Sequence, residues 1–201
     1  MSKIVLYVEG DTEVALKKHL KAFLDERAET EGKPKVTLET RKLVTRKADK
    51  LHRDVKRELR RRDVLGVVGL IDVFPNFKNA EEAKRHLRRA VGDEPNFYPH
   101  AAQYDVEAWL LPFWNDICRR IGVRQSSPGS KPETVNGMNP PAYRLTNLYK
   151  RAKKPKRDYK KAIEMAAILK GKDLAVAAES CPELKAFLNT LLRLNGLRLL
   201  V

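Results

Sequence analysis

Continuous apolar runs alternate with stretches of helical periodicity over the first two thirds of the chain. Residues 4–8 (IVLYV) and 64–71 (VLGVVGLI) lack the polar alternation of a half-exposed strand, which is typical of strands buried on both faces. After the first run, apolar residues between Leu16 and Leu24 recur every three or four positions, as on one face of a helix. The chain therefore begins with a predicted strand followed by a predicted helix.

The alternation continues beyond this first unit. Strands are expected at 4–8, 35–44, 64–71 and 97–102, and helices from residue 11 or 12 onward and at 48–61, 80–91, 141–150, 159–169 and 182–194. A further helix through Val106 and Phe113 is expected to be disturbed at Pro112. Alternating strands and helices form βαβ units with right-handed crossovers. The predicted fold class is α/β, with a mostly parallel sheet flanked by helices.

The last third of the chain has a different character. Residues 125–141 are rich in Ser, Pro, Gly and Asn, which predicts a long loop. Only helices are predicted after it. We therefore expect residues 1–121 to form an α/β core, and residues 122–201 to form a loop and a C-terminal helical appendage packed on that core.

Two of the predicted strands end in an acidic residue. Glu9 follows the strand at 4–8, and Asp72 follows the strand at 64–71. The carboxyl ends of parallel strands share one edge of a sheet, where open α/β folds bind ligands. Two carboxylates there repel each other and favour a divalent cation between them. The alternative is that Glu9 and Glu13 only interact with the next helix N-terminus, and that Asp72 is a turn residue.

The turn after the first strand contains the segment Gly10-Asp11-Thr12. Gly10 is expected to supply the permissive backbone of a tight turn. Asp11 or Thr12 is expected to cap the following helix.

Basic residues far outnumber acidic ones. The 41 Lys and Arg against 26 Asp and Glu give a formal net charge of +15, which suggests a polyanionic partner. The basic residues cluster at 41–62 and 144–161, and we interpret both blocks as phosphate-contacting surfaces rather than plain solvated faces. Few aromatic residues accompany them, so backbone contact with little sequence preference is expected. The candidates for nucleic-acid binding are Arg41, Lys42, Arg46, Lys47, Lys50, Arg53, Lys153, Lys154, Lys156 and Arg157.

Neither zinc nor a disulfide framework is expected. Cys118 and Cys181 lie far apart without a CxxC motif, and the four histidines form no i, i+4 pair. Free cysteines fit a reducing compartment, and we expect a cytoplasmic protein. No signal peptide or membrane span is predicted, because the first apolar run is short and ends in an acid.

The opening motif VEGDTE, residues 8–13, resembles the first motif of the Toprim superfamily, the metal-binding domain of topoisomerases, primases and overcoming-lysogenization-defect nucleases. Leu70-Ile71-Asp72 stands where Toprim proteins carry their second acidic motif. Residues 102–111 (AQYDVEAWLL) look like the acid-rich helix start of a Toprim-related branch, domain of unknown function 4276. The tail is also similar, at Pro132-Glu133, at Tyr159-Lys160 and in the closing helix after Cys181-Pro182.

This resemblance implies a metal-dependent site. It makes Glu9 a general acid/base or a ligand beside the scissile phosphate, and Asp72 a ligand of Mg²⁺ or Mn²⁺. Glu13 is either a water-mediated ligand or a cap. Asp105 and Glu107 would diverge by roughly 200° on a helix, but both reach the site if they precede the helix or lie on its first turn. The expected catalytic residues are Glu9 and Asp72, and the expected metal ligands are Glu9, Glu13, Asp72, Asp105 and Glu107.

The chain departs from the Toprim pattern in its second motif. Toprim enzymes usually carry Asp-x-Asp, whereas this chain has Asp72-Val73-Phe74. The difference leaves open a one-metal enzyme, recruitment of Asp105 or Glu107 as a replacement ligand, or loss of catalysis.

Two functions therefore remain as expectations. The first is a metal-dependent nuclease acting on DNA or RNA, in genome or phage defence beside an ATPase partner. The sequence has no GxxxxGK[ST] motif, so ATP hydrolysis would come from another subunit. The second is a catalytically inactive Toprim-like module that binds nucleic acid or a partner. A homo-oligomer is compatible with both.

Overall fold

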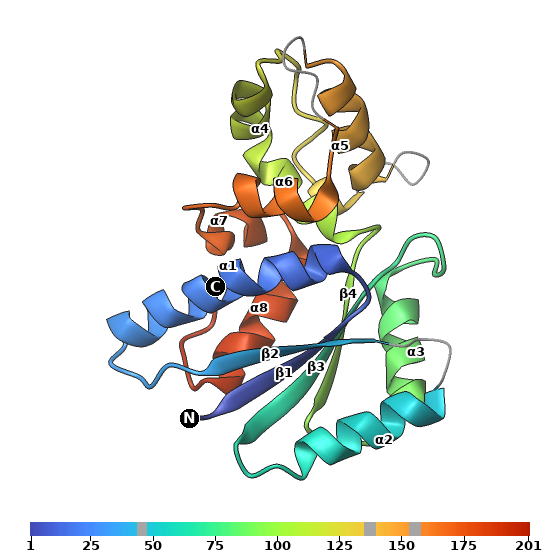
Figure 1. Cartoon of the computed structure of the whole chain (residues 1–201), viewed down its shortest axis with the longest axis vertical. Helices are drawn as coiled ribbons and strands as arrows, with labels where there is room; N and C mark the ends of the chain where they lie inside the picture. The colour runs from blue at the N-terminus through green and yellow to red at the C-terminus, as the bar shows by residue number, and fades with distance from the viewer. Residues whose placement is uncertain (44–47, 135–139, 153–157) are drawn as a thin grey trace.

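The computed structural model describes residues 1–43, 48–134, 140–152 and 158–201. A four-stranded parallel sheet, in the order β2-β1-β3-β4, forms its centre (Figure 1). The strands are β1 (Lys3–Val8), β2 (Thr37–Lys42), β3 (Val64–Asp72) and β4 (Phe97–Ala102). The predicted α/β class is confirmed, and Asp72 is the last residue of β3.

The helices follow the predicted pattern closely. They are α1 (Asp11–Thr30), α2 (Ala48–Leu59), α3 (Ala80–Val91), the 3₁₀ helix η1 (Val106–Phe113), α4 (Trp114–Ile121), the 3₁₀ turn η2 (Pro132–Thr134), α5 (Pro141–Lys150), α6 (Lys161–Ile168), α7 (Leu174–Ala178) and α8 (Pro182–Leu194). The 3₁₀ turn η2 lies inside the predicted loop. The five-residue helix α7 was not predicted, because it is too short to show a period.

Helices cover both faces of the sheet. Along β1, Ile4 and Leu6 join a core shared with α1 and α8, whereas Val5 and Tyr7 join a core shared with α2 and α3. This alternation is what a strand buried on both faces requires, since successive side chains point to opposite faces. The predicted double burial of β1 is therefore confirmed.

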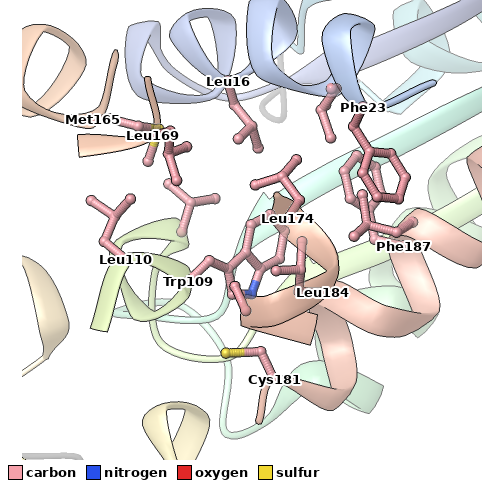
Figure 2. Packing of buried hydrophobic residues seen from close by; sticks show 14 of the residues in the cluster. Leu16, Phe23, Trp109, Leu110, Met165, Leu169, Leu174, Cys181, Leu184 and Phe187 are labelled. Atoms are coloured by element: carbon pink, nitrogen blue, oxygen red, sulfur yellow. The ribbon is translucent and has the colours of Figure 1, made fainter. Parts of the chain in front are cut away.

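The larger core extends beyond the sheet to the helices near the carboxyl ends of the strands. Figure 2 shows Leu16 and Phe23 of α1 above Trp109 of η1 and Phe187 of α8. The rings of Trp109 and Phe187 stack, with 5.8 Å between their centroids. Because this cluster includes residues from both sides of position 121, α8 belongs to the layer that covers the sheet. The division into 1–121 and 122–201 stays a prediction.

The segment around Pro112 is a 3₁₀ helix, which agrees with the expected disturbance. Proline lacks the N–H that an α-helix needs, and the tighter 3₁₀ turn accommodates it. Among the described residues, no helix is both long enough and apolar enough to span a membrane.

The turn after β1 corrects a prediction. Gly10, not Asp11 or Thr12, is the N-cap of α1, with an extended backbone at φ −130° that any residue can adopt. Its lack of a side chain is needed for space, because a Cβ there would lie 2.9 Å from Oε2 of Glu13. The glycine therefore allows Glu13 to fold back over the turn.

Candidate functional site

Acidic residues gather where three neighbouring strands end. Glu9 follows β1, Asp72 ends β3, and Asp105 lies just beyond β4. Oε2 of Glu9 accepts a hydrogen bond of 3.0 Å from the backbone N–H of Asp72. The ends of β1 and β3 are thus joined through a carboxylate, as the rule for parallel strand ends predicts.

Asp72 and Asp105 connect the sheet to the helices above it. Oδ1 of Asp72 accepts a hydrogen bond of 3.1 Å from the N–H of Val106, the first residue of η1. Oδ2 of Asp105 accepts one of 3.2 Å from the N–H of Ala142, at the start of α5. Both carboxylates therefore lie at helix N-termini, where the exposed N–H groups stabilise negative charge.

Glu13 lies one turn into α1 and is buried. Its Oε2 accepts a hydrogen bond of 3.0 Å from the N–H of Gly10, so the capping role considered for Glu13 is present. Burial, the dominant cause, and the charges of Glu107 and Glu9 raise its pKa. The residue is therefore both a cap and a member of the acidic group.

Asp105 and Glu107 both face this region. Asp105 has an extended backbone before η1, and Glu107 lies in the first turn of that helix. Glu107 is fully buried, and its Oε1 forms an ion pair of 3.2 Å with Nζ of Lys161. Oδ1 of Asp105 and Oε2 of Glu107 have no hydrogen-bond partner among the described residues. Of the two placements considered for this pair, the structure has the one just before the helix and on its first turn.

The carboxylates at this edge of the sheet interact electrostatically. Burial raises the pKa of Asp72 well above its ordinary value, and the charges of Glu13, Asp105, Glu107 and Glu9 raise it further. Burial also raises the pKa of Glu9, Asp105 and Glu107. Ionising all five is costly without a compensating cation. We call these residues the acidic cluster: Glu9, Glu13, Asp72, Asp105 and Glu107.

A divalent cation suits this chemistry. Carboxylate oxygens are the hard donors that Mg²⁺ and Mn²⁺ prefer, and the unpartnered oxygens of Asp105 and Glu107 are such donors. Within the described part of the chain, no three His, Cys, Asp or Glu side chains stand together so that they could hold a metal ion as they are. The donor set thus fits the ion, while binding requires the side chains to turn inward.

Comparison with known protein families identifies the family of this chain. The chain matches the domain of unknown function DUF4276 over residues 8–192. The chain belongs to the DUF4276 family. Comparisons with curated proteins and with solved structures gave no match. All five members of the acidic cluster lie inside the matched DUF4276 range, and the predicted resemblance to DUF4276 is confirmed.

Two residues of this DUF4276 site were not predicted. Lys161, at the start of α6, is half exposed and pairs with Glu107. Burial lowers its pKa, but the charges of Glu107, Asp105 and other acids outweigh that and leave the pKa raised. The buried hydroxyl of Tyr159 has no hydrogen-bond partner among the described residues, and burial raises its pKa. The sequence offered only the Tyr159-Lys160 resemblance and a basic block, neither of which pointed to Glu107.

His86 of α3 also influences the site. Its charge lowers the pKa of Glu9, which burial otherwise raises. Its ring lies 5.2 Å from that of Phe77, between centroids. No sequence pattern singled out this histidine.

The buried Glu133 has a structural role. Its Oε1 accepts a hydrogen bond of 2.9 Å from Nε1 of Trp109, and its Oε2 accepts one of 2.9 Å from the N–H of Glu183. The carboxylate therefore fixes η2 between η1 and the start of α8. The Pro132-Glu133 similarity thus marks a residue that holds the helices around the site.

The predicted nucleic-acid-binding residues differ in what they contact. Arg41 forms ion pairs with Glu39 and Glu58, so its charge is compensated. Lys42 is exposed at the end of β2. Lys50 and Arg53 are exposed on α2 and form no ion pair with the described residues. Six candidates lie outside the described residues: Arg46, Lys47, Lys153, Lys154, Lys156 and Arg157.

Helix α3 adds basic residues that were not among the candidates. Arg85 and Arg89 are exposed, and neither forms an ion pair with the described residues. Helix α3 lies beside α2 on the same face of the sheet (Figure 1). Lys50 and Arg53 on α2, with Arg85 and Arg89 on α3, are therefore exposed cations of two neighbouring helices, and we call these four residues the basic surface.

Proposed function

We propose that this DUF4276 protein is a metal-dependent phosphodiesterase that cuts nucleic acid. The observation that carries the proposal is the acidic cluster, in which carboxylates from three strand ends and two helices lie together, and the pKa values of Asp72, Glu13 and Asp105 are raised by neighbouring acids as well as by burial. Structural acids are normally placed beside cations or hydrogen-bond donors that satisfy them. Buried carboxylate oxygens without a hydrogen-bond partner among the described residues, as in Asp105 and Glu107, favour a functional site at the carboxyl edge of a parallel sheet.

The chemistry divides between the ion and the protein. Bound Mg²⁺ or Mn²⁺ would polarise a phosphate and stabilise charge on the leaving oxygen. Asp72, Asp105 and Glu107 offer the oxygens that would hold it. Glu9 is fixed by the N–H of Asp72, and burial raises its pKa, which favours the protonated form that a general acid needs. Nζ of Lys161 can leave Glu107 to contact a phosphate oxygen, since its side chain is half exposed.

The basic surface supplies what the acidic cluster lacks. A polyanionic strand would be repelled by five carboxylates, so it needs cations nearby to hold it. Lys50, Arg53, Arg85 and Arg89 are exposed and unpaired among the described residues. With a net charge of +15, the chain is suited to hold a nucleic-acid backbone.

A Toprim-type relationship extends this proposal. It rests on the VEGDTE motif and on Asp72 at the end of β3. The same resemblance suggests a role in genome or phage defence beside a separate ATPase subunit. A cytoplasmic location and assembly into a homo-oligomer belong to the same set of expectations.

A second candidate function is an inactive Toprim-like module that binds nucleic acid or a protein. Phe74 in place of the second-motif acid favours it, as does the lack, among the described residues, of three metal-ligating side chains that stand together. The two functions differ in their dependence on a metal ion.

Cleavage assays separate the two candidates. Labelled single- and double-stranded DNA and RNA would be incubated with Mg²⁺, Mn²⁺ or EDTA and with wild type, Glu9→Gln or Asp72→Asn. The enzyme requires cutting that depends on the metal and is lost in both variants. Salt-sensitive binding without cutting of any substrate would instead favour the binding module. Equal cutting by all three proteins would reject the acidic cluster as the active site.

A further inference from the structure

An exposed aromatic side chain stands beside the acidic cluster. Phe74 is 46 % exposed, whereas the other phenylalanines are buried or partly buried. It lies two residues after Asp72, on the loop that joins β3 to α3. Leaving a phenylalanine in water forgoes about 1.5–3 kcal/mol of burial free energy. The exposure of the Phe74 ring to solvent at this position therefore needs an explanation.

The loop that carries Phe74 is held firmly. The N–H of Phe74 donates a hydrogen bond of 2.7 Å to the carbonyl of Tyr104, and the N–H of Val73 donates one of 3.1 Å to the carbonyl of Ala102. On its other side, the N–H of Phe77 donates a bond of 2.8 Å to the carbonyl of Val73. The ring is therefore presented from a fixed backbone.

Tyr104, whose carbonyl accepts the hydrogen bond from Phe74, is a second aromatic residue at this edge of the sheet. It precedes Asp105 and has a φ of 68°, which is costly for a residue with a side chain. Its side chain is partly exposed and lines a cavity of about 750 Å³ between η2 and the start of α8. Each aromatic residue thus accompanies an acid, Phe74 with Asp72 and Tyr104 with Asp105.

We propose that Phe74 and Tyr104 form a stacking subsite for the bases of an unpaired nucleic-acid strand whose phosphodiester lies at the acidic cluster. This inference rests on the proposed function. Aromatic faces bind bases of any sequence by stacking, and only unpaired bases expose their faces. The substrate class is therefore single-stranded nucleic acid, or an unpaired segment of a duplex. Bases in a continuous duplex cannot reach the rings.

Binding tests the subsite without cleavage. The probes are a fluorescent single-stranded oligonucleotide, the same strand with abasic central nucleotides, and its duplex, measured by anisotropy in EDTA. Wild type is expected to bind the strand with bases roughly 5- to 150-fold more tightly than the abasic strand. Phe74→Ala is expected to bind both alike. Phe74→Trp should keep the preference, because it restores the aromatic face.

Leu65→Ala is the matched control. Leu65 is a partly exposed apolar residue near the start of β3, roughly 23 Å along the strand from Asp72. It should behave as wild type. The proposal is overturned if Phe74→Ala keeps the preference, if wild type shows none, or if the duplex binds more tightly than the single strand. Since no cleavage is measured, these outcomes do not depend on whether the protein is a nuclease.

Discussion

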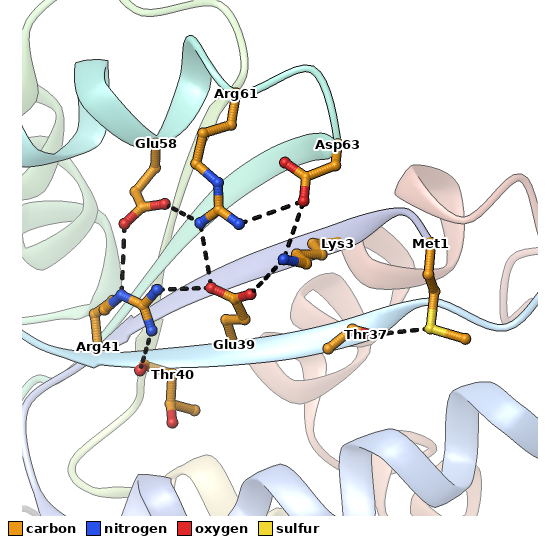
Figure 3. A network of polar contacts seen from close by, with 9 residues as sticks. All are labelled: Met1, Lys3, Thr37, Glu39, Thr40, Arg41, Glu58, Arg61 and Asp63. Carbon is orange, nitrogen blue, oxygen red and sulfur yellow. Dashed lines mark hydrogen bonds and ion pairs between the residues drawn. The ribbon is translucent and has the colours of Figure 1, made fainter.

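Two groups of acidic residues lie at the same sheet, and their surroundings shift carboxylate pKa values in opposite directions. Figure 3 shows the first, in which Lys3, Glu39, Arg41, Glu58, Arg61 and Asp63 alternate in charge across β1, β2 and the end of α2. Arg61 and Lys3 lower the pKa of Glu39 to about 2. The second group is the acidic cluster, where burial raises the pKa of every member and like charges raise those of Asp72, Glu13 and Asp105 further. We call the first group the ion-pair network.

The difference teaches which acids maintain the fold. A carboxylate in the ion-pair network is stabilised when ionised, so it contributes to stability at neutral pH. A carboxylate in the acidic cluster is destabilised when ionised, and Lys161 is the one cation that an ion pair assigns to it among the described residues. Stability alone does not account for the acidic cluster, and the proposed binding of a cation would account for it.

The largest expected effect comes from Asp72→Asn. The amide keeps an acceptor for the N–H of Val106 but removes a charge. Cleavage should fall at least about a hundredfold, because a ligand of the ion is lost. Stability at pH 8 should not fall, since a repulsion disappears. Steady-state kinetics and thermal melts measure both, and a large loss of stability with unchanged cleavage would contradict the comparison.

Metal ions should stabilise the protein in a pH-dependent manner. Mg²⁺ or Mn²⁺ at about 100 times its Kd adds about 2.7 kcal/mol, or roughly 5–10 °C in Tm for a chain of this size. The raised pKa of Asp72 means that the folded state holds its proton more tightly, so stability without metal falls as pH rises through that pKa. Melting curves at pH 8 and pH 5.5 should show the larger metal shift at pH 8. A shift of the same size in Asp72→Asn would place the ion elsewhere.

Breaking the ion-pair network should affect stability alone. Glu58 is buried and accepts from Arg61 at 2.6 Å. Glu58→Gln should cost about 1–2 kcal/mol, between the values for exposed and buried pairs, because the arginines are partly exposed. Denaturant unfolding measures this loss, and cleavage should be unchanged. The network as a whole should weaken as pH falls from 4.5 toward 2, where Glu39 takes up a proton.

The smallest effect is expected from Gly10→Ala. The new Cβ would meet Oε2 of Glu13 at 2.9 Å and push that carboxylate from the N–H of Gly10. Losing this hydrogen bond should cost about 0.5–1.5 kcal/mol, with a loss of cleavage below about tenfold. A double-mutant cycle with Glu13→Ala identifies the cause, since the glycine substitution should cost little once the carboxylate is gone. An equal cost in both backgrounds would show that Gly10 acts independently of Glu13.

Sequence patterns predicted the sheet and the core of the site for a physical reason. Continuous apolar runs identified β1 and β3, and parallel strand ends share an edge, so Glu9 and Asp72 had to be neighbours. The lengths of β1 and β3 in the structure differ from the prediction by single residues.

The remaining features depended on contacts between distant segments. Lys161 comes from α6, far from Glu107 in the sequence, and charge clustering suggested only a surface role for it. The sequence suggested that Arg41 is a free cation, but in the structure it forms an ion pair with Glu58 of α2. The role of Gly10 followed from the position of one side chain rather than from backbone conformation. Such placements come from tertiary packing, which local patterns do not encode.

The central claim is that the acidic cluster binds a divalent metal ion. Titration calorimetry of Mn²⁺ into wild type, Asp72→Asn and Glu58→Gln tests it most directly. We predict saturable binding to wild type and to Glu58→Gln, and a loss of at least about tenfold in affinity for Asp72→Asn. Absence of Mn²⁺ binding to wild type, or equal binding by Asp72→Asn, would contradict the claim.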